Sequence, residues 1–307
     1  MTPKTLSRRM LLAAGAGSLL GGCSVAARRP GDPLRDAPPV SLPRSHQVDM
    51  RDAATGHVRR IFVQVPEQPA PNGGHPTLYV LDANAVFVMA AQIARNMGNR
   101  PPGLRPDPLM IVGIGYPTES SMDQQARKRD YTPPPATEPG TGGAEEFLDF
   151  IQKQLQPALR AAWPTDASRQ TLFGHSLGGL LAVHALATRT RMFTRYAAAS
   201  PSLWWNGGRT LQTVEGWLAR APAEAADRPQ VQLRVGALER AARSHDPQRA
   251  AKASERLMNE HAETLAARLS AGRIPVDFKE FPGLDHGGVI MPALTDAVLF
   301  AAQRSAM

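Results

Sequence analysis

Residues 171–179 read Thr171-Leu172-Phe173-Gly174-His175-Ser176-Leu177-Gly178-Gly179, and the apolar run Leu180-Leu181-Ala182-Val183 follows. An apolar, strand-like run precedes Ser176 and a helix-forming run follows it, so Gly174-x-Ser176-x-Gly178 lies at a strand-to-helix turn. Such a turn strains the serine backbone, and it needs flanking glycines because a Cβ would collide with the neighbouring strand and helix. The pattern predicts a nucleophilic serine at the carboxyl end of a sheet. A tight turn with an idle serine is the alternative.

Around this turn, strand-like and helix-like segments alternate along the chain. The expected strands are 47–50, 58–65, 77–81, 109–115, 196–199, 231–235 and 276–281, and the expected helices are 84–97, 143–163, 210–221, 250–271 and 289–302. The first two strands form a hairpin, and alternation after it is typical of a mostly parallel sheet flanked by helices. With the serine turn in the middle, the pattern predicts an α/β fold of the α/β-hydrolase type. Residues 116–141 carry five prolines and no periodicity, so we expect a long functional loop there.

The amino terminus is typical of a targeting segment, which we assign to residues 1–23. Ser7-Arg8-Arg9-Met10-Leu11-Leu12 resembles a twin-arginine export signal, and Leu20-Gly21-Gly22-Cys23 resembles a lipoprotein processing site. Cys23 is the only cysteine in the chain, so no internal disulfide can form. We expect a lipid on Cys23, with ordinary cleavage nearby as the alternative. Because Ser24 rather than an aspartate follows Cys23, we expect a periplasmic protein anchored to the outer membrane.

The remaining chain is expected to contain a flexible linker at 24–45 and one catalytic domain at 46–307. A chain of 307 residues with 42% hydrophobic residues can bury a single large core. Removing Lys4, Arg8 and Arg9 leaves 32 basic against 27 acidic residues, a net charge of +5. This mild excess suits an anionic substrate or a membrane surface, whereas the absence of a basic run with interleaved aromatics argues against nucleic acid. We expect a monomer.

No motif for a metal or a nucleotide cofactor is found in the sequence. His-Glu-x-x-His and cysteine clusters are absent, and no Gly-x-Gly-x-x-Gly follows a strand. We therefore expect neither a metal nor a cofactor.

A serine hydroxyl needs a base to accept its proton and a third group to orient that base. In this fold the order along the chain is serine, acid, histidine. Three histidines follow Ser176 beyond its own helix, and only His286 lies in a glycine-flanked loop directly after the last strand. His261 falls within an expected helix and His245 in a charged loop. We therefore predict His286 as the base. A loop histidine that caps the final helix is the alternative.

The acid is predicted to be Glu239, which lies just beyond the strand ending at Val235. Asp285 is adjacent to His286 in sequence and would rarely reach its imidazole, and Asp246 is the fallback. A serine–histidine dyad oriented by a backbone carbonyl is also open.

Attack on a carbonyl creates an oxyanion that needs at least two fixed donors. We predict the backbone N–H of Leu177 as the first, because it follows the nucleophile. The second should come from the turn after Leu81, at Ala83 or Asn84. Asp82 in that turn is explained equally well as a helix cap.

Several segments together resemble the putative-esterase family of α/β-hydrolases, and within it the siderophore esterases that hydrolyse trilactones such as enterobactin and salmochelin. These segments are Leu81-Asp82-Ala83-Asn84-Ala85-Val86-Phe87, Gly113-Ile114-Gly115-Tyr116, Arg127-Lys128-Arg129-Asp130-Tyr131-Thr132-Pro133, Gly174-His175-Ser176-Leu177-Gly178-Gly179 and Ser200-Pro201-Ser202-Leu203-Trp204-Trp205. The similarity covers roughly residues 46–302, and Ala83 stands where the family commonly has glycine.

The resemblance implies a serine esterase that cleaves a catecholate siderophore ester, in its ferric form, through an acyl-enzyme. It also implies that Arg127, Arg129, Tyr131 and Trp204 contact the substrate. Taken alone, the run Arg127-Lys128-Arg129-Asp130 is explained as a solvated charged face, in which Asp130 pairs with a neighbour. An arginine presents fixed donors and a planar face, which suit anionic oxygens and catechol rings. The alternatives are a general carboxylesterase or acyltransferase, or a lipid-anchored siderophore-binding protein without turnover.

Overall fold

The computed structural model of the chain describes residues 34–220, 228–240 and 247–304. The chain divides into two compact units, residues 1–41 and 42–307. In the first unit, the described residues 34–41 form turns and irregular structure. In the described part of the chain, no helix combines the length and the apolar character needed to cross a membrane.

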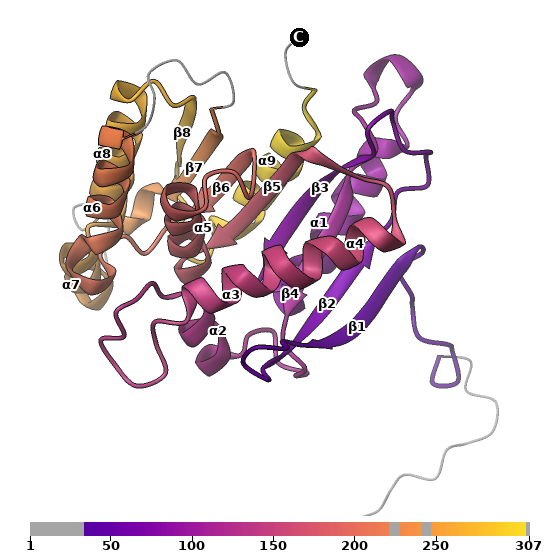
Figure 1. Cartoon of the computed structure of the whole chain (residues 1–307), viewed down its shortest axis with the longest axis horizontal. Coiled ribbons are helices and arrows are strands. Elements are labelled where there is room, and N and C mark those ends of the chain that lie inside the picture. The colour runs from indigo at the N-terminus through magenta and orange to yellow at the C-terminus, as the bar shows by residue number, and fades with distance from the viewer. Residues whose placement is uncertain (1–33, 221–227, 241–246, 305–307) are drawn as a thin grey trace, which may run out of the picture. The chain divides into compact units, whose positions relative to one another are not determined.

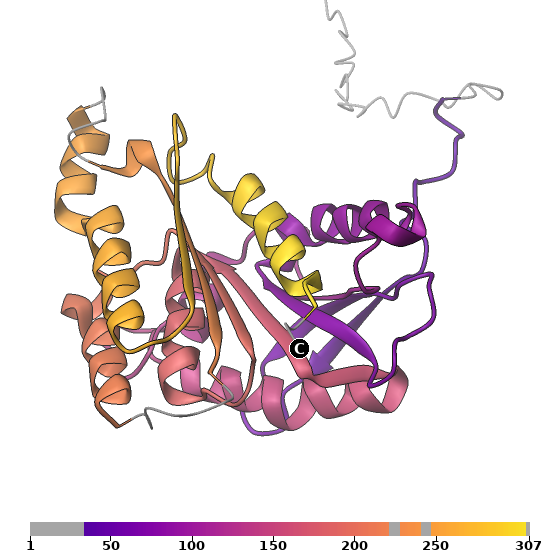
Figure 2. The same ribbon diagram turned by 90° about the horizontal axis from the view of Figure 1, so that it is seen from above.

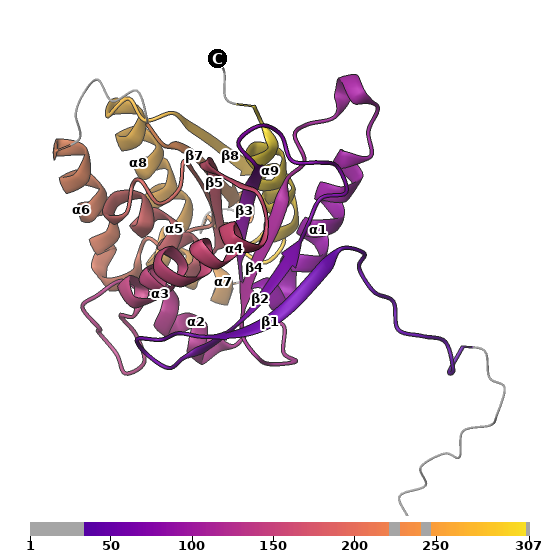
Figure 3. The same cartoon turned by 45° about the vertical axis from the view of Figure 1, so that its right-hand side comes forward.

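The second unit is built on one twisted sheet, whose strands run across the centre of Figure 1. Its strands are β1 (Ser45–Arg51), β2 (Val58–Gln64), β3 (His75–Leu81), β4 (Met110–Gly115), β5 (Thr165–His175), β6 (Arg195–Ala199), β7 (Gln230–Gly236) and β8 (Val276–Phe281). The spatial order is β1-β2-β4-β3-β5-β6-β7-β8. β1, β2 and β4 pair antiparallel, and the remaining neighbours pair in parallel. Figure 3 brings the antiparallel β1 edge forward. The predicted fold class is confirmed.

Helices cover both faces of this sheet. They are α1 (Ala83–Gly98), α2 (Gln124–Tyr131), α3 (Ala144–Phe150), α4 (Gln156–Ala162), α5 (Leu177–Thr188), α6 (Trp205–Arg220), α7 (Pro247–Arg256), α8 (Met258–Ala271) and α9 (Ile290–Ala302). α1 and α9 pack together on one face, and α3, α5 and α8 pack on the other. Figure 2 shows α1 and α9 above the sheet and α3 with α4 below it.

The two faces of β3 explain why this strand is wholly apolar at its centre. Leu78 and Val80 point into the core beneath α1 and α9, whereas Tyr79 and Leu81 point into the core beneath α5. Successive side chains of a strand alternate between faces, so a central strand covered on both sides needs apolar residues at every position. Each such side chain contributes about 1.5–3 kcal/mol on burial. The carboxyl end of β3 is thereby fixed beside that of β5.

Three expected segments differ from the structure. Residues 116–141 are not a structureless loop, because they contain α2, whose buried face carries Arg127, Asp130 and Tyr131 in place of an apolar stripe. The expected helix at 250–271 is two helices, because Leu257 adopts a left-handed conformation (φ 46°) between α7 and α8. The expected helix at 143–163 contains a π-helical segment, Ile151–Leu155, between α3 and α4.

Candidate active site

Ser176 lies at the sharp turn between β5 and α5, where its backbone has φ 59° and ψ −116°. Its N–H donates to the carbonyl of Ala199 at 2.9 Å, which ties the turn to the neighbouring strand β6. A Cβ on Gly174 would lie 2.2 Å from the carbonyl oxygen of Gly178, so position 174 must be glycine. The strained turn is therefore held by its neighbours, as the sequence pattern predicts.

His286 faces Ser176 from the loop after β8. Its Nε2 lies 3.1 Å from Ser176 Oγ, and its Nδ1 lies 2.7 Å from Glu239 Oε2. A carboxylate only accepts hydrogen bonds, so Nδ1 carries the proton and Nε2 presents its lone pair to the hydroxyl. The structure thus brings together the three residues expected to act as nucleophile, base and acid.

Glu239 is almost fully buried, and its carboxylate is satisfied by protein groups. Besides His286, Oε1 accepts from Ser200 Oγ at 2.5 Å and from the N–H of Gly236 at 2.7 Å. Burying a charged group is unfavourable unless it is hydrogen-bonded, so these donors allow the acid to remain inside the protein. They also fix its orientation toward the base.

Three residues of this arrangement were not identified from the sequence as site residues. Ser200 binds the acid, and Ser202 Oγ lies 3.3 Å from Ser176 Oγ. His175 donates from Nε2 to the backbone oxygen of His286 at 2.8 Å. Burial, and then the charge of His286, lowers the pKa of His175 well below its usual range. Two sequence features could have identified them: His175 lies inside the Gly-x-Ser-x-Gly motif, and the two serines belong to the segment Ser200-Pro201-Ser202.

The turn between β3 and α1 lies against the first turn of α5. A Cβ on Gly178 would lie 3.4 Å from Leu81 Cδ1 and 3.8 Å from Asp82 Oδ2. Leu177 opens α5 and Ala83 opens α1, and N–H groups in the first turn of a helix lack intrahelical acceptors. Both N–H groups therefore lack an intrahelical acceptor, which leaves them available as the predicted oxyanion donors.

In the turn between β3 and α1, the side chains of Asp82 and Asn84 both bind groups outside α1. Asp82 precedes α1 with φ 53°, but its carboxylate makes no capping hydrogen bond. Both its oxygens instead bind Arg127, at 2.9 and 3.0 Å, so Asp82 stands at the N-cap position of α1 without capping the helix through its side chain. The side chain of Asn84 is bound to backbone groups of Tyr116 and Thr118 and holds the loop after β4.

The residues of α2 that were expected to contact a substrate occupy different environments. Arg127 is 6% exposed and is bound by Asp82. Tyr131 is fully buried, and its hydroxyl accepts the N–H of Asp82 at 3.1 Å. These two side chains bind Asp82 in the turn after β3. Arg129 is more exposed and donates to Asp130 at 2.7 Å.

Trp204 follows Ser202 by two residues and is partly buried. The guanidinium of Arg256 lies over its indole ring, 4.8 Å from the ring centroid. The indole Nε1 is buried and has no hydrogen-bond partner within the described ranges. The Trp204 ring, with the Arg256 guanidinium over it, thus lies two residues from Ser202, whose hydroxyl is next to that of Ser176.

The other candidates considered for base and acid are placed as follows. His245 and Asp246 lie outside the described residues. His261 binds the backbone oxygen of Arg256 at 3.1 Å through Nδ1, and Asp285 accepts the N–H of Gly288 at 2.8 Å. Across the ranges 34–220, 228–240 and 247–304, no group of three or more His, Cys, Asp or Glu side chains could hold a metal ion.

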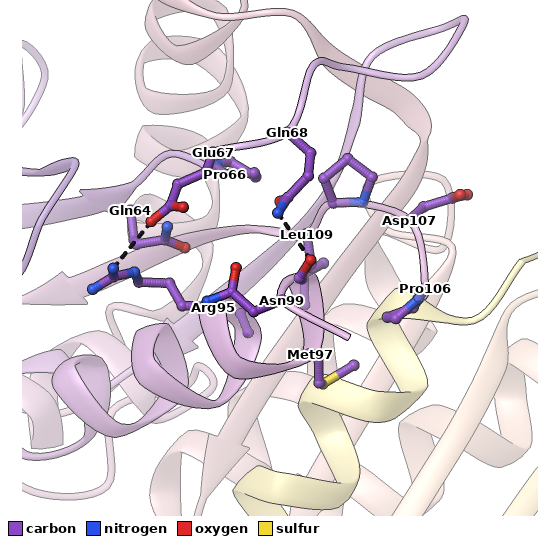
Figure 4. Close-up of a pocket in the computed structure, with 13 residues that line it drawn as sticks. Gln64, Pro66, Glu67, Gln68, Arg95, Met97, Asn99, Pro106, Asp107 and Leu109 are labelled. Atoms are coloured by element: carbon purple, nitrogen blue, oxygen red, sulfur yellow. Dashed lines mark hydrogen bonds and ion pairs between the residues drawn. The ribbon is translucent and has the colours of Figure 1, made fainter. Parts of the chain in front are cut away.

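A small hollow at the opposite end of the sheet is separate from these residues. It is bordered by Gln68, Arg95 and Leu109, near the beginning of β4, and has a volume of about 10 Å³ (Figure 4). Gln68 closes it by donating to the carbonyl of Gly98, and Arg95 pairs with Glu67. Such a space holds about one water molecule. It therefore offers no room for an organic substrate.

The chain is similar to several known proteins. The model of a family described as "Putative esterase" matches residues 53–300. Ferri-bacillibactin esterase BesA of Bacillus subtilis is 35% identical over 256 residues, which cover 78% of this chain and 83% of that protein. Siderophore triacetylfusarinine C esterase of Aspergillus fumigatus is 34% identical over 274 residues, or 82% and 91% of the two chains. The crystal structure of the BES protein from Bacillus cereus has a TM-score of 0.75 and 31% identity, and covers 88% and 98% of the two chains.

Proposed function

The chain belongs to the putative esterase family and is an ester hydrolase, and from this membership we propose that it cleaves the ester bonds of a siderophore through an acyl-enzyme on Ser176. The observation that carries the proposal is the hydrogen-bonded series from Ser176 Oγ to His286 to Glu239, at 3.1 and 2.7 Å. The relatives named as siderophore esterases support the substrate class.

In the first half of the reaction, Ser176 Oγ attacks the ester carbonyl carbon while His286 Nε2 accepts the hydroxyl proton. The negative charge that develops on the carbonyl oxygen is stabilised by the N–H groups of Leu177 and Ala83. Glu239 holds the imidazole in the required tautomer and stabilises the imidazolium. When the carbon–oxygen bond to the alcohol breaks, His286 returns the proton to the leaving oxygen, and the acyl group remains on Ser176.

In the second half, a water molecule replaces the alcohol. His286 accepts a proton from the water as its oxygen attacks the acyl carbon, and the same two N–H groups stabilise the new oxyanion. Collapse breaks the bond to Ser176 Oγ, and His286 returns the proton to that oxygen. The products are a carboxylic acid and the original enzyme.

For the finer identity of the substrate, we propose a catecholate trilactone bound in its ferric form. Such a substrate combines aromatic rings with net negative charge. Trp204 offers aromatic surface, and Arg256, which lies over its ring, and Arg129 supply positive charge. This assignment prefers Arg129, whose side chain is 27% exposed, to Arg127, whose side chain is 7% exposed and binds both oxygens of Asp82.

The test is a panel of ferric and iron-free siderophore esters with the product masses recorded. We expect hydroxy-acid fragments of a trilactone to appear with wild-type protein and to be absent with Ser176→Ala. A fluorophosphonate should label the wild type and not this variant. Labelling without cleavage of any siderophore, together with cleavage of simple esters, would favour the general carboxylesterase. Acyl transfer to an added alcohol in place of water would favour the acyltransferase, and siderophore binding without labelling would favour a binding protein.

For localisation, we propose export by the twin-arginine route and anchoring to the outer membrane through a lipid on Cys23. Arg8, Arg9 and the run ending in Cys23 support this proposal. The mature protein should fractionate with membranes, and Cys23→Ala should release a soluble enzyme with unchanged kinetics. An unmodified mature terminus found by mass spectrometry would contradict it.

A further inference from the structure

The Asp82–Ala83 peptide bond carries the N–H that we assign as the second oxyanion donor, so the groups that fix this peptide also fix the direction of that donor. The carbonyl of Asp82 accepts the N–H of Ala85 at 2.9 Å and therefore points into α1. In a planar trans peptide the N–H points opposite to the carbonyl. The N–H of Ala83 is consequently directed away from the helix. Its direction depends on Asp82 keeping its left-handed conformation, which is uncommon for a residue other than glycine.

Three hydrogen bonds from α2 hold Asp82 in that conformation. Arg127 donates from Nε and Nη2 to the two carboxylate oxygens at 2.9 and 3.0 Å. The hydroxyl of Tyr131, one helical turn later, accepts the N–H of Asp82 at 3.1 Å. Side chains four residues apart lie on the same face of a helix, so one face of α2 forms hydrogen bonds with both the side chain and the backbone of Asp82. The Arg127 and Asp82 side chains are 7% and 6% exposed.

α2 is itself attached to the sheet by a second buried ion pair. Asp130 accepts from Arg59 of β2 at 2.9 Å, and Arg59 also pairs with Asp52 at 3.2 Å. The guanidinium of Arg59 lies over Phe147 and Phe150, at 4.9 and 4.7 Å from their ring centroids. The three charged side chains are 1–2% exposed. A rigid connection therefore runs from β2 through α2 to the turn that follows β3.

We propose that Arg127 is a positioning residue for catalysis, which holds the Ala83 N–H toward the oxyanion by clamping Asp82. The role rests on the proposed function, because it requires an acyl-transfer reaction at Ser176. It differs from substrate binding, since the guanidinium donates to both oxygens of Asp82 and the Arg127 side chain is only 7% exposed. The Arg127–Asp82 interaction should stabilise the transition state rather than the bound substrate. The reason is that the Ala83 N–H is needed only when negative charge develops on the carbonyl oxygen.

The test compares Arg127→Met, Arg127→Lys and the isosteric Asp82→Asn on a small neutral ester. Loss of one oxyanion donor typically lowers kcat by about 10²–10³. We expect Arg127→Met and Asp82→Asn to lower kcat by about 10² with KM nearly unchanged. The double variant should fall little further, because both changes break one interaction. Arg127→Lys should restore part of the loss, since it keeps the charge without the two-pronged geometry.

A second readout separates positioning from a merely structural role. A trifluoromethyl ketone forms a tetrahedral adduct with the serine, and its oxyanion uses the same donors. Its inhibition constant should rise in Arg127→Met by about the same factor as kcat falls. The matched control is Arg169→Met, which breaks a partly buried ion pair with Asp107 near the other end of β5. This control should keep kcat and the inhibition constant, even if its melting temperature falls as far as that of Arg127→Met.

Unchanged kcat and inhibition constant in Arg127→Met, or losses that only follow the unfolded fraction, would overturn the positioning role. If Arg127→Met does not fold, Asp82→Asn gives the same comparison. A wild type that a fluorophosphonate does not label would overturn the proposed function and this role together. A labelled wild type with unaffected variants would overturn this role alone.

Discussion

Nε2 of His175 lies 2.8 Å from the backbone oxygen of His286, so the residue before the nucleophile holds the main chain of the base. The two imidazole rings are 4.5 Å apart between centroids. A carbonyl oxygen only accepts, so His175 carries its proton on Nε2. Because burial lowers its pKa well below the usual range, the ring is neutral in the folded protein. The β5 turn and the loop after β8 are thereby linked directly.

We predict that His175→Phe lowers kcat about tenfold, because loss of one buried hydrogen bond loosens the loop that carries His286.

The same change should alter the pH dependence of stability. An unfolded histidine takes up a proton below its ordinary pKa of about 6.5, whereas native His175 does not, so the wild type loses stability as the pH falls below that value. Denaturant unfolding at pH 7.5 and 5.5 should show a smaller decrease for His175→Phe. Equal decreases in both proteins would contradict the neutral, buried state.

Ser176→Ala and His286→Ala should each abolish hydrolysis, with losses on the order of 10⁶ in kcat. The two groups act as a unit, so the double variant should be no slower than either single one. Steady-state kinetics on a chromogenic ester would measure this. Activity that survived in His286→Ala but not in His245→Ala would show that the base has been assigned to the wrong residue.

Glu239→Gln should cost less than removal of the base, roughly 10²–10⁴ in kcat. Glutamine keeps the size of the side chain but removes the charge that stabilises the imidazolium. Ser200→Ala, which removes one of the donors to Glu239, serves as the milder companion variant and should lose about tenfold. Wild-type rates in Glu239→Gln would instead support a serine–histidine dyad.

Arg129→Ala and Arg256→Ala should raise KM for a ferric catecholate substrate while leaving cleavage of a small neutral ester nearly intact. We expect their positive charges to assist binding of an anion, so rising salt should partly mimic the substitutions. Arg127→Ala should slow the cleavage of both substrates, because Arg127 holds the turn between β3 and α1. Equal losses on both substrates in Arg129→Ala would assign that arginine to holding α2 in place.

Glu145 provides a test of acid stability away from the site. The hydrogen bond with His184, supported by Arg189, lowers the pKa of Glu145 to about 2. The unfolded carboxyl titrates near 4.5, so this contribution is present above pH 4.5 and is lost as the pH falls toward 2. We expect Glu145→Gln to destabilise the protein by about 1 kcal/mol at pH 7, after allowance for partial exposure. Urea unfolding at pH 7 and pH 3 should show a smaller difference at pH 3.

Much of the fold could be predicted because its signals are local. The alternation of apolar runs identified the strands, and the glycines around Ser176 identified the turn. Topology then placed Glu239 after one strand and His286 after another, since parallel strands bring their carboxyl ends to one edge of a sheet. The structure brings these three residues together, and the predicted fold class and esterase activity are confirmed.

What sequence reasoning missed depends on pairings across long stretches of chain. α2 has no apolar stripe, because its buried face is formed by Arg127, Asp130 and Tyr131, so a search for hydrophobic periodicity assigns it to a loop. The partners of the two charges, Asp82 and Arg59, lie 45 and 71 residues away in sequence. A charged residue looks the same in sequence whether it is solvated or paired, and only the assembled sheet decides between the two.

The position of β8 has a consequence for how the protein is made. This strand is at the edge of the sheet and pairs only with β7 among the described strands, and His286 follows it directly. Chains emerge from the ribosome with the amino terminus first, and domains generally fold as units. Ser176 and Glu239 are thus synthesised before the base, and α9, which covers β3 and β5, is synthesised last. A nascent chain therefore remains catalytically silent until its final strand and helix have joined the sheet.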